Sequence, residues 1–152
     1  MTLICYEISG AHFNPIISLS LQMLQKSNLS QMVKYIMVQF MGYFSASVLI
    51  YAQLSPEIWE LTEQKSKIGI PYQDFPDIFG LIAEFLGGFV IVWIYIALCV
   101  DPLNKKNPLV ISIAIGFSYL LTGSTIGHIS GGAFNPHRSI APSLFLAEIT
   151  KE

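Results

Sequence analysis

The chain is poor in charged residues, in cysteine and in arginine. Charged side chains make up 12% of its 152 residues, about half the share that is usual in soluble domains. Two cysteines are too few for a disulfide framework or a cysteine metal site. A net charge of −2 without a basic cluster argues against a nucleic-acid partner. Together these shortages favour a chain embedded in a lipid bilayer over a soluble domain.

What the chain does contain is long apolar runs, within a composition that is 53% hydrophobic. A helix that crosses a bilayer needs roughly 20 mostly apolar residues. The runs predict spanning helices at residues 35–54, 78–100 and 109–126. Gln39 is the main polar interruption of the first run, and Glu84 is the only charge in the second.

A short motif is written twice, once near each end. Residues 8–15 read Ile-Ser-Gly-Ala-His-Phe-Asn-Pro, and residues 129–136 read Ile-Ser-Gly-Gly-Ala-Phe-Asn-Pro. The two copies are too widely spaced for a solenoid repeat. In an apolar chain they indicate two related halves that meet around one site.

Each Asn-Pro is followed by a short apolar stretch, residues 15–24 and 136–147. Asparagine is a good helix N-cap, and proline suits the first helical turn. Because both stretches are too short to span, we predict two half-helices that begin inside the membrane. With their loops they form the segments 8–24 and 129–147. The loop carbonyls, expected from residues 8–13 and 129–134, would face a wet cavity together with the positive helix ends.

The links between the spans predict a multi-pass topology. Lys26 and Lys34 flank the link into the first span, and Lys105 and Lys106 lie in the short link before the third. The long link, residues 55–77, is mainly acidic. The positive-inside rule places the lysine-bearing links in the cytoplasm and the long link outside.

The two motifs, with Ala141-Pro142 after the second, resemble the signature loops of the major intrinsic protein family, the aquaporins and related glycerol-type channels. The resemblance covers nearly the whole chain, residues 1–152, as a single partial domain. It implies an all-α membrane protein with a partial aquaporin-like fold of three spanning helices and two re-entrant Asn-Pro half-helices. It also implies a passive channel for water or small neutral solutes, which is not an enzyme and has no cofactor or metal. The expected setting is a homotetramer in a lipid bilayer, the plasma membrane.

By this resemblance the central motifs fall on two tripeptides, Asn14-Pro15-Ile16 and Asn135-Pro136-His137. The two asparagines would be the central amide donors. The family's usual alanine after each Asn-Pro is replaced here by Ile16 and His137. Three outcomes are open for these larger side chains. They could pack in place of the alanines, strain the contact between the half-helices, or shift the half-helices and reshape the centre of the pore. His137 also raises the alternative of a pH gate near the pore.

The resemblance makes Arg138 the arginine of a narrow selectivity filter near the outer mouth. An unpaired charge at membrane depth costs roughly 2.5 to 3.5 kcal/mol, which a wet pore wall relieves. The alternative is an arginine that snorkels to the outer interface. Counting back from Asn135 puts further filter positions on Gly123 and Gly132, a wide aperture suited to glycerol-like solutes. If the alignment slips, Tyr119 takes the first position and narrows it.

Three further polar residues are expected to line the pore or to support its loops. His12 would lie next to Asn14 at the cytoplasmic vestibule. Gln39 and Glu84 match buried polar positions of the family, and we interpret Glu84 as an acceptor for loop N–H groups rather than as a catalytic acid. The tyrosines are interpreted as interface anchors and core.

The family pattern has two spans before the first motif and one after the second. We therefore expect an incomplete chain that lacks the first two and the last spanning helices, through a fragment, an incomplete gene model or a truncated isoform. A second functional class is a non-conducting, structural or assembly-modifying subunit, which Ile16, His137 and the missing helices favour. A membrane enzyme is disfavoured, because the sequence holds no nucleophile–base–metal constellation.

Overall fold

The structure is a computed structural model that describes residues 1–53, 76–100 and 107–149. Of residues 146–149 it describes the backbone alone. Within these ranges every regular element is a helix. They are α1 (Thr2–Ser9), α2 (Pro15–Met23), α3 (Leu29–Gln53), α5 (Asp77–Cys99), α6 (Pro108–Ser130) and α7 (Pro136–Ile149). The predicted all-α architecture is confirmed.

Helices α3, α5 and α6 are long and apolar enough to cross a membrane, as predicted. Helix α3 begins at Leu29 rather than at Tyr35, because Asn28 caps it: Asn28 Oδ1 accepts a hydrogen bond from the Gln31 N–H at 2.7 Å. Residues 55–75 of the long link, and Lys105 and Lys106, lie outside the described residues, so the sidedness of the membrane stays a prediction.

The two half-helices, α2 and α7, have 9 and 14 residues, fewer than the roughly 20 that a span needs. The loops before them are shorter than expected. Helix α1 continues through Ser9, and α6 continues through Ser130, where loop had been expected. Each helix ends at a glycine in the left-handed conformation, Gly10 with φ 69° and Gly131 with φ 89°. Glycine adopts this C-cap conformation without steric cost, so the helix runs up to it.

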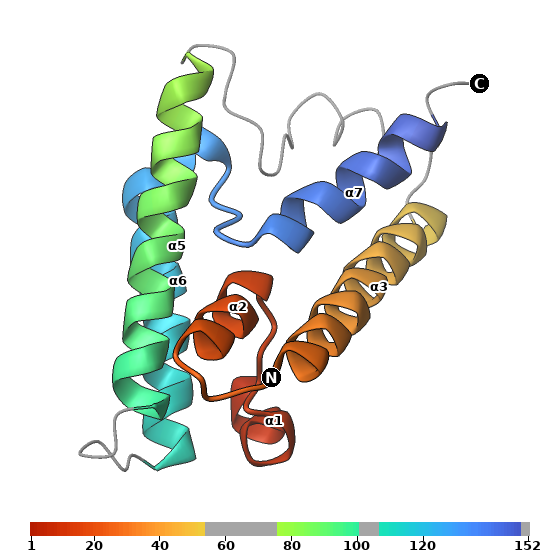
Figure 1. Ribbon diagram of the computed structural model, residues 1–152. Coiled ribbons are helices and arrows are strands. Elements are labelled where there is room, and N and C mark those ends of the chain that lie inside the picture. Colours follow the sequence, from red (N-terminus) through yellow and green to blue (C-terminus); the bar gives the residue numbers. More distant parts are fainter. Residues whose placement is uncertain (54–75, 101–106, 150–152) are drawn as a thin grey trace.

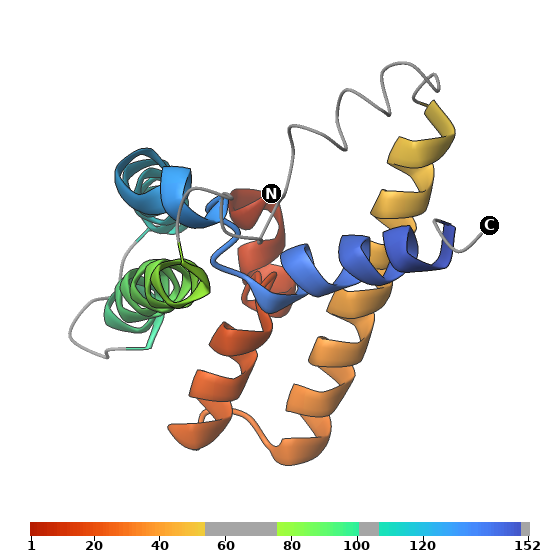
Figure 2. The ribbon, with the colours of Figure 1, turned by 90° about the horizontal axis from the view of Figure 1, so that it is seen from above.

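The half-helices lie between two walls of long helices (Figure 1). Helices α5 and α6 pack side by side and form one wall, and α3 forms the other. Helix α2 contacts α3 and α5, and α7 packs along α3. Seen from above, α2 and α7 extend from the middle of the molecule in different directions (Figure 2). This arrangement brings the N-terminal ends of α2 and α7 together.

A cluster of buried apolar side chains lies between α2, α5 and α6. It consists of Ile17, Leu21, Tyr95, Ile111 and Ile115. Large apolar side chains of the long helices point outward instead; Phe85 is 69% exposed and Trp93 is 65% exposed. Such a surface suits contact with lipid, where apolar side chains carry no hydration cost.

Candidate functional site

The site lies where α2 and α7 begin, and each helix is capped by its own asparagine. Asn14 Oδ1 accepts a hydrogen bond from the Ile16 N–H at 3.0 Å, and Asn135 Oδ1 accepts one from the His137 N–H at 3.0 Å. The intervening proline has no N–H to satisfy, so Asn-Pro begins a helix with few unpaired donors. The cap uses the oxygen of each amide and leaves its NH2 group to donate elsewhere.

Each NH2 group donates to the loop of the other half. Asn14 Nδ2 donates to the carbonyl of Phe134 at 2.8 Å, and Asn135 Nδ2 donates to the carbonyl of Phe13 at 2.8 Å. Asn14 and Asn135 are 1% and 4% exposed. The structure therefore brings the repeated motifs together as a reciprocal pair, with both helix N-termini directed at one point.

A carboxylate from α5 fixes the second loop. Glu84 Oε1 accepts hydrogen bonds from Ser130 Oγ at 2.5 Å and from the Ala133 N–H at 3.0 Å, and Glu84 Oε2 accepts one from the Phe134 N–H at 2.5 Å. Phe134 has φ 48°, an uncommon value for a residue with a side chain. These bonds offset that conformational cost and account for a charge in the middle of an apolar helix.

The aromatic ring of Phe134 packs where α5 carries Gly87. A Cβ at Gly87 would lie 2.2 Å from the Phe134 ring. Because no side chain fits between them, the glycine lets the second loop lie directly on α5.

Side chains of α3 and α5 hold the first loop through its carbonyl groups. Gln39 Nε2 donates to the His12 carbonyl and, at 3.0 Å, to Ser18 Oγ. Three phenols donate to further carbonyls: Tyr35 to Ser9 at 3.0 Å, Tyr95 to Gly10 at 2.6 Å and Tyr43 to Phe13 at 3.3 Å. The loop carbonyls were expected to face a wet cavity, and the structure gives each of these four a side-chain donor. The tyrosines thus do more than anchor the interface or fill the core.

Two phenol hydroxyls also accept hydrogen bonds from the central amides. Tyr43 of α3 places its hydroxyl oxygen 3.0 Å from Asn135 Nδ2, and Tyr119 of α6 places its own 3.4 Å from Asn14 Nδ2. The sequence predicts Tyr119 as an alternative filter residue and, with the other tyrosines, as an interface anchor or core residue. In the structure its hydroxyl reaches the central asparagine pair.

The two residues that directly follow the Asn-Pro pairs are accommodated by different neighbours. His137 is 7% exposed, and its ring lies 5.7 Å from that of Phe40 and 6.4 Å from that of Tyr43, between centroids. Ile16 is half-buried and reaches α5, where its Cδ1 would lie 3.4 Å from a Cβ at Gly88. Neither side chain separates the reciprocal asparagine bonds.

Arg138 and Gly132 come together beside the second asparagine. The exposed Arg138 donates from Nη1 to the Gly132 carbonyl at 2.9 Å. Gly132 has φ 65°, and a Cβ there would lie 3.2 Å from the Gly127 Cα, so its backbone requires glycine. Gly123 is half-buried, and a Cβ there would meet no atom within 4 Å. The prediction of a wide filter therefore depends on Gly123, because Gly132 has a conformational reason of its own.

A family model described as Major intrinsic protein matches the chain over residues 1–152. The chain belongs to the major intrinsic protein family. As the family and the apolar helices together show, it is an integral membrane protein.

Among its curated relatives in this family is the glycerol uptake facilitator protein of Bacillus subtilis, 29% identical over 142 residues, which cover 90% of this chain and 50% of the relative. Aquaporin-3 of Milnesium tardigradum is 28% identical over 158 aligned positions, which cover 91% of this chain and 46% of the relative. Aquaporin NIP2-1 of Zea mays is 27% identical over 138 residues, which cover 91% of this chain and 43% of the relative. The chain thus spans about half the length of the curated relatives it matches.

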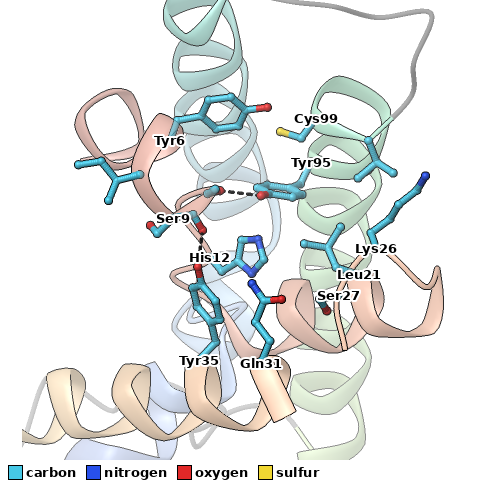
Figure 3. Close-up of a pocket in the computed structure, with 13 residues that line it drawn as sticks. Tyr6, Ser9, His12, Leu21, Lys26, Ser27, Gln31, Tyr35, Tyr95 and Cys99 are labelled. Carbon is cyan, nitrogen blue, oxygen red and sulfur yellow. Dashed lines mark hydrogen bonds between the residues drawn. The ribbon is translucent and has the colours of Figure 1, made fainter. Parts of the chain in front are cut away.

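In this member of the major intrinsic protein family, a cavity of about 470 Å³ lies between α1, the first loop, the beginning of α3 and the end of α5. Figure 3 shows His12 and Tyr95 near its middle, Tyr35 and Gln31 on one side, and Cys99 on another. The cavity wall includes two buried polar atoms without a hydrogen-bond partner in the structure, His12 Nδ1 and Ser27 Oγ. His12 therefore lines a cavity at the end of the molecule that carries Lys26, and its place in a pore vestibule stays a prediction.

Sequence reasoning named both asparagines, Arg138, Gln39 and Glu84, but it missed the role of the tyrosines. Tyr35, Tyr43, Tyr95 and Tyr119 bind loop carbonyls or central amides. The available signal was their position inside apolar helices, since a buried phenol usually finds a hydrogen-bond partner.

Proposed function

We propose that the protein is a passive transmembrane channel for water and small uncharged solutes. The observation that carries the proposal is the reciprocal pair of Asn14 and Asn135 at the meeting N-termini of two half-helices. Two positive helix ends and two amide donors at one point favour a neutral solute with a hydroxyl or carbonyl oxygen. The same positive field disfavours cations and protons.

Glycerol-like solutes are the proposed substrates beside water. Gly123 leaves open space on α6, and Arg138 offers a guanidinium beside the second half-helix. One relative is named a glycerol uptake facilitator. Family membership also favours a channel over an enzyme, and we further propose a homotetramer in the plasma membrane.

Swelling of vesicles under osmotic gradients tests the proposal. The preparation is the native protein, with its two ends established by mass spectrometry, because the present chain spans about half the length of its relatives. We expect water and glycerol to enter faster than in protein-free vesicles. Arg138→Trp should abolish entry while assembly persists, since a bulky ring would replace the filter guanidinium. Entry no faster than in protein-free vesicles would refute the channel, and entry unchanged by Arg138→Trp would refute the assigned filter.

A non-conducting, assembly-modifying subunit is the second candidate. It is favoured by Tyr43 and Tyr119, whose hydroxyls lie on the two central amides. It predicts that vesicles holding this protein alone never swell faster, whereas vesicles that also hold a conducting family member change their rate.

A further inference from the structure

The central amides are already hydrogen-bonded within the protein. A side-chain amide has two N–H donors. Those of Asn135 have two acceptors within reach, the Phe13 carbonyl at 2.8 Å and the Tyr43 hydroxyl at 3.0 Å. Those of Asn14 likewise have the Phe134 carbonyl at 2.8 Å and, more weakly, the Tyr119 hydroxyl at 3.4 Å. A solute oxygen can bind Asn135 only by displacing one of its acceptors.

Of these acceptors, the Tyr43 hydroxyl is the one that can leave. The Phe13 carbonyl belongs to a loop that several side chains hold, whereas the phenol is the end of a side chain on α3. The hydroxyl accepts from Asn135 Nδ2 and donates to the Phe13 carbonyl at 3.3 Å. A neutral hydroxyl solute would make the same two bonds, one accepted from the amide and one donated to the carbonyl.

The neighbours of Tyr43 explain why its ring rests there. His137 lies against it, with ring centroids 6.4 Å apart, and Phe40 lies against His137 at 5.7 Å. An alanine at position 137 would offer no such ring. His137 and Tyr43 thus form one packed unit beside Asn135.

We propose that Tyr43 is an internal occupant of the central solute site, whose hydroxyl must leave Asn135 before a hydroxyl-bearing solute, water or a polyol, can bind there. The inference rests on the proposed channel function and names the residue that restricts it. Tyr119 exerts the same restraint on Asn14 to a smaller degree, because its bond is longer.

The test compares Tyr43→Phe with the wild-type native protein in vesicles, for water and for glycerol. The phenylalanine keeps the ring and removes the competing oxygen. A single hydrogen bond corresponds to a roughly two- to twelve-fold change in an equilibrium, so we expect both permeabilities to rise within that range. Tyr119→Phe should give a smaller rise. Tyr51→Phe, on the same helix but at a 37% exposed position, should give none.

A structural readout separates this inference from the channel function itself. In a high-resolution structure of Tyr43→Phe, we expect an ordered water or glycerol oxygen within hydrogen-bond distance of Asn135 Nδ2, where the wild type has the phenol. If no preparation conducts, the proposed channel fails, and this oxygen alone decides the role of Tyr43. If the wild type conducts, an unchanged permeability in Tyr43→Phe would overturn the inference, and in either case so would the absence of an oxygen at Asn135 in the Tyr43→Phe structure.

Discussion

Asn14 and Asn135 each complete the loop of the other. Each asparagine caps its own half-helix with its oxygen and donates from its nitrogen to the carbonyl that precedes the opposite asparagine, at 2.8 Å in both directions. The two loops therefore form one hydrogen-bonded unit rather than two similar sites. Groups that hold either loop therefore stabilise both.

Replacing Glu84 with glutamine should weaken the second loop. The carboxylate accepts three hydrogen bonds through its two oxygens, whereas a glutamine keeps one oxygen and turns an NH2 group toward a donor. We expect the free energy of unfolding in detergent to fall by about 1.5–3 kcal/mol, the range for hydrogen bonds to a charged group. The matched control is Glu7→Gln on the exposed face of α1. Equal stability of the two variants would contradict this account.

Adding a methyl group at Gly87 should displace Phe134. The new Cβ would lie 2.2 Å from the ring, which is far inside van der Waals contact. Overpacking of this kind costs about 1–3 kcal/mol, so we expect Gly87→Ala to lower the melting temperature. Gly116→Ala on α6 is the control, because a Cβ there meets no atom within 4 Å. If both alanines melt alike, the loop does not rest on α5 as described.

A histidine at position 123 should narrow the proposed filter. The space around Gly123 accepts a side chain without a clash at Cβ, so the fold should persist. In vesicle swelling, we expect Gly123→His to reduce glycerol entry more than water entry, because glycerol is the larger solute. Gly116→His, at an exposed position on the same helix, should leave the ratio of the two rates unchanged. A ratio that moves equally in both variants would remove Gly123 from the filter.

Permeability should not change stepwise with pH through His137. The imidazole is 7% exposed and packs against Phe40 and Tyr43, an apolar setting in which a charged ring is poorly solvated. We expect a flat profile between about pH 5 and pH 8, around the ordinary titration range of histidine. Swelling rates across that range check this. A step present in the wild type and absent from His137→Ala would establish the pH gate instead.

The sequence was sufficient to predict the elements that depend on local chemistry. Apolar length predicted α3, α5 and α6, and Asn-Pro followed by a short apolar stretch predicted α2 and α7. Helix α1 and the end of α6 were not predicted, although Gly10 and Gly131 occupy equivalent positions in the two motifs and both cap a helix. The capping glycine, rather than the first residue of the repeated motif, determines where each of these helices ends.

The contacts of the tyrosines could not be predicted in the same way. Tyr43 lies 92 residues before Asn135, and Tyr119 lies 105 residues after Asn14. Which hydroxyl reaches which amide depends on how α3 and α6 stand relative to the half-helices. Periodicity within one helix carries no information about that placement. Gly132 shows the converse: its backbone conformation is by itself a sufficient reason for a glycine, and its place in the filter stays a prediction.

The exchange of hydrogen bonds between the two asparagines has a consequence for the order of assembly. Asn14 is synthesised 120 residues before Phe134, the residue whose carbonyl it binds. Contacts of such long sequence separation form slowly. The Asn14 amide therefore lacks this acceptor until the second loop, which carries Phe134, has been synthesised and has packed against the first.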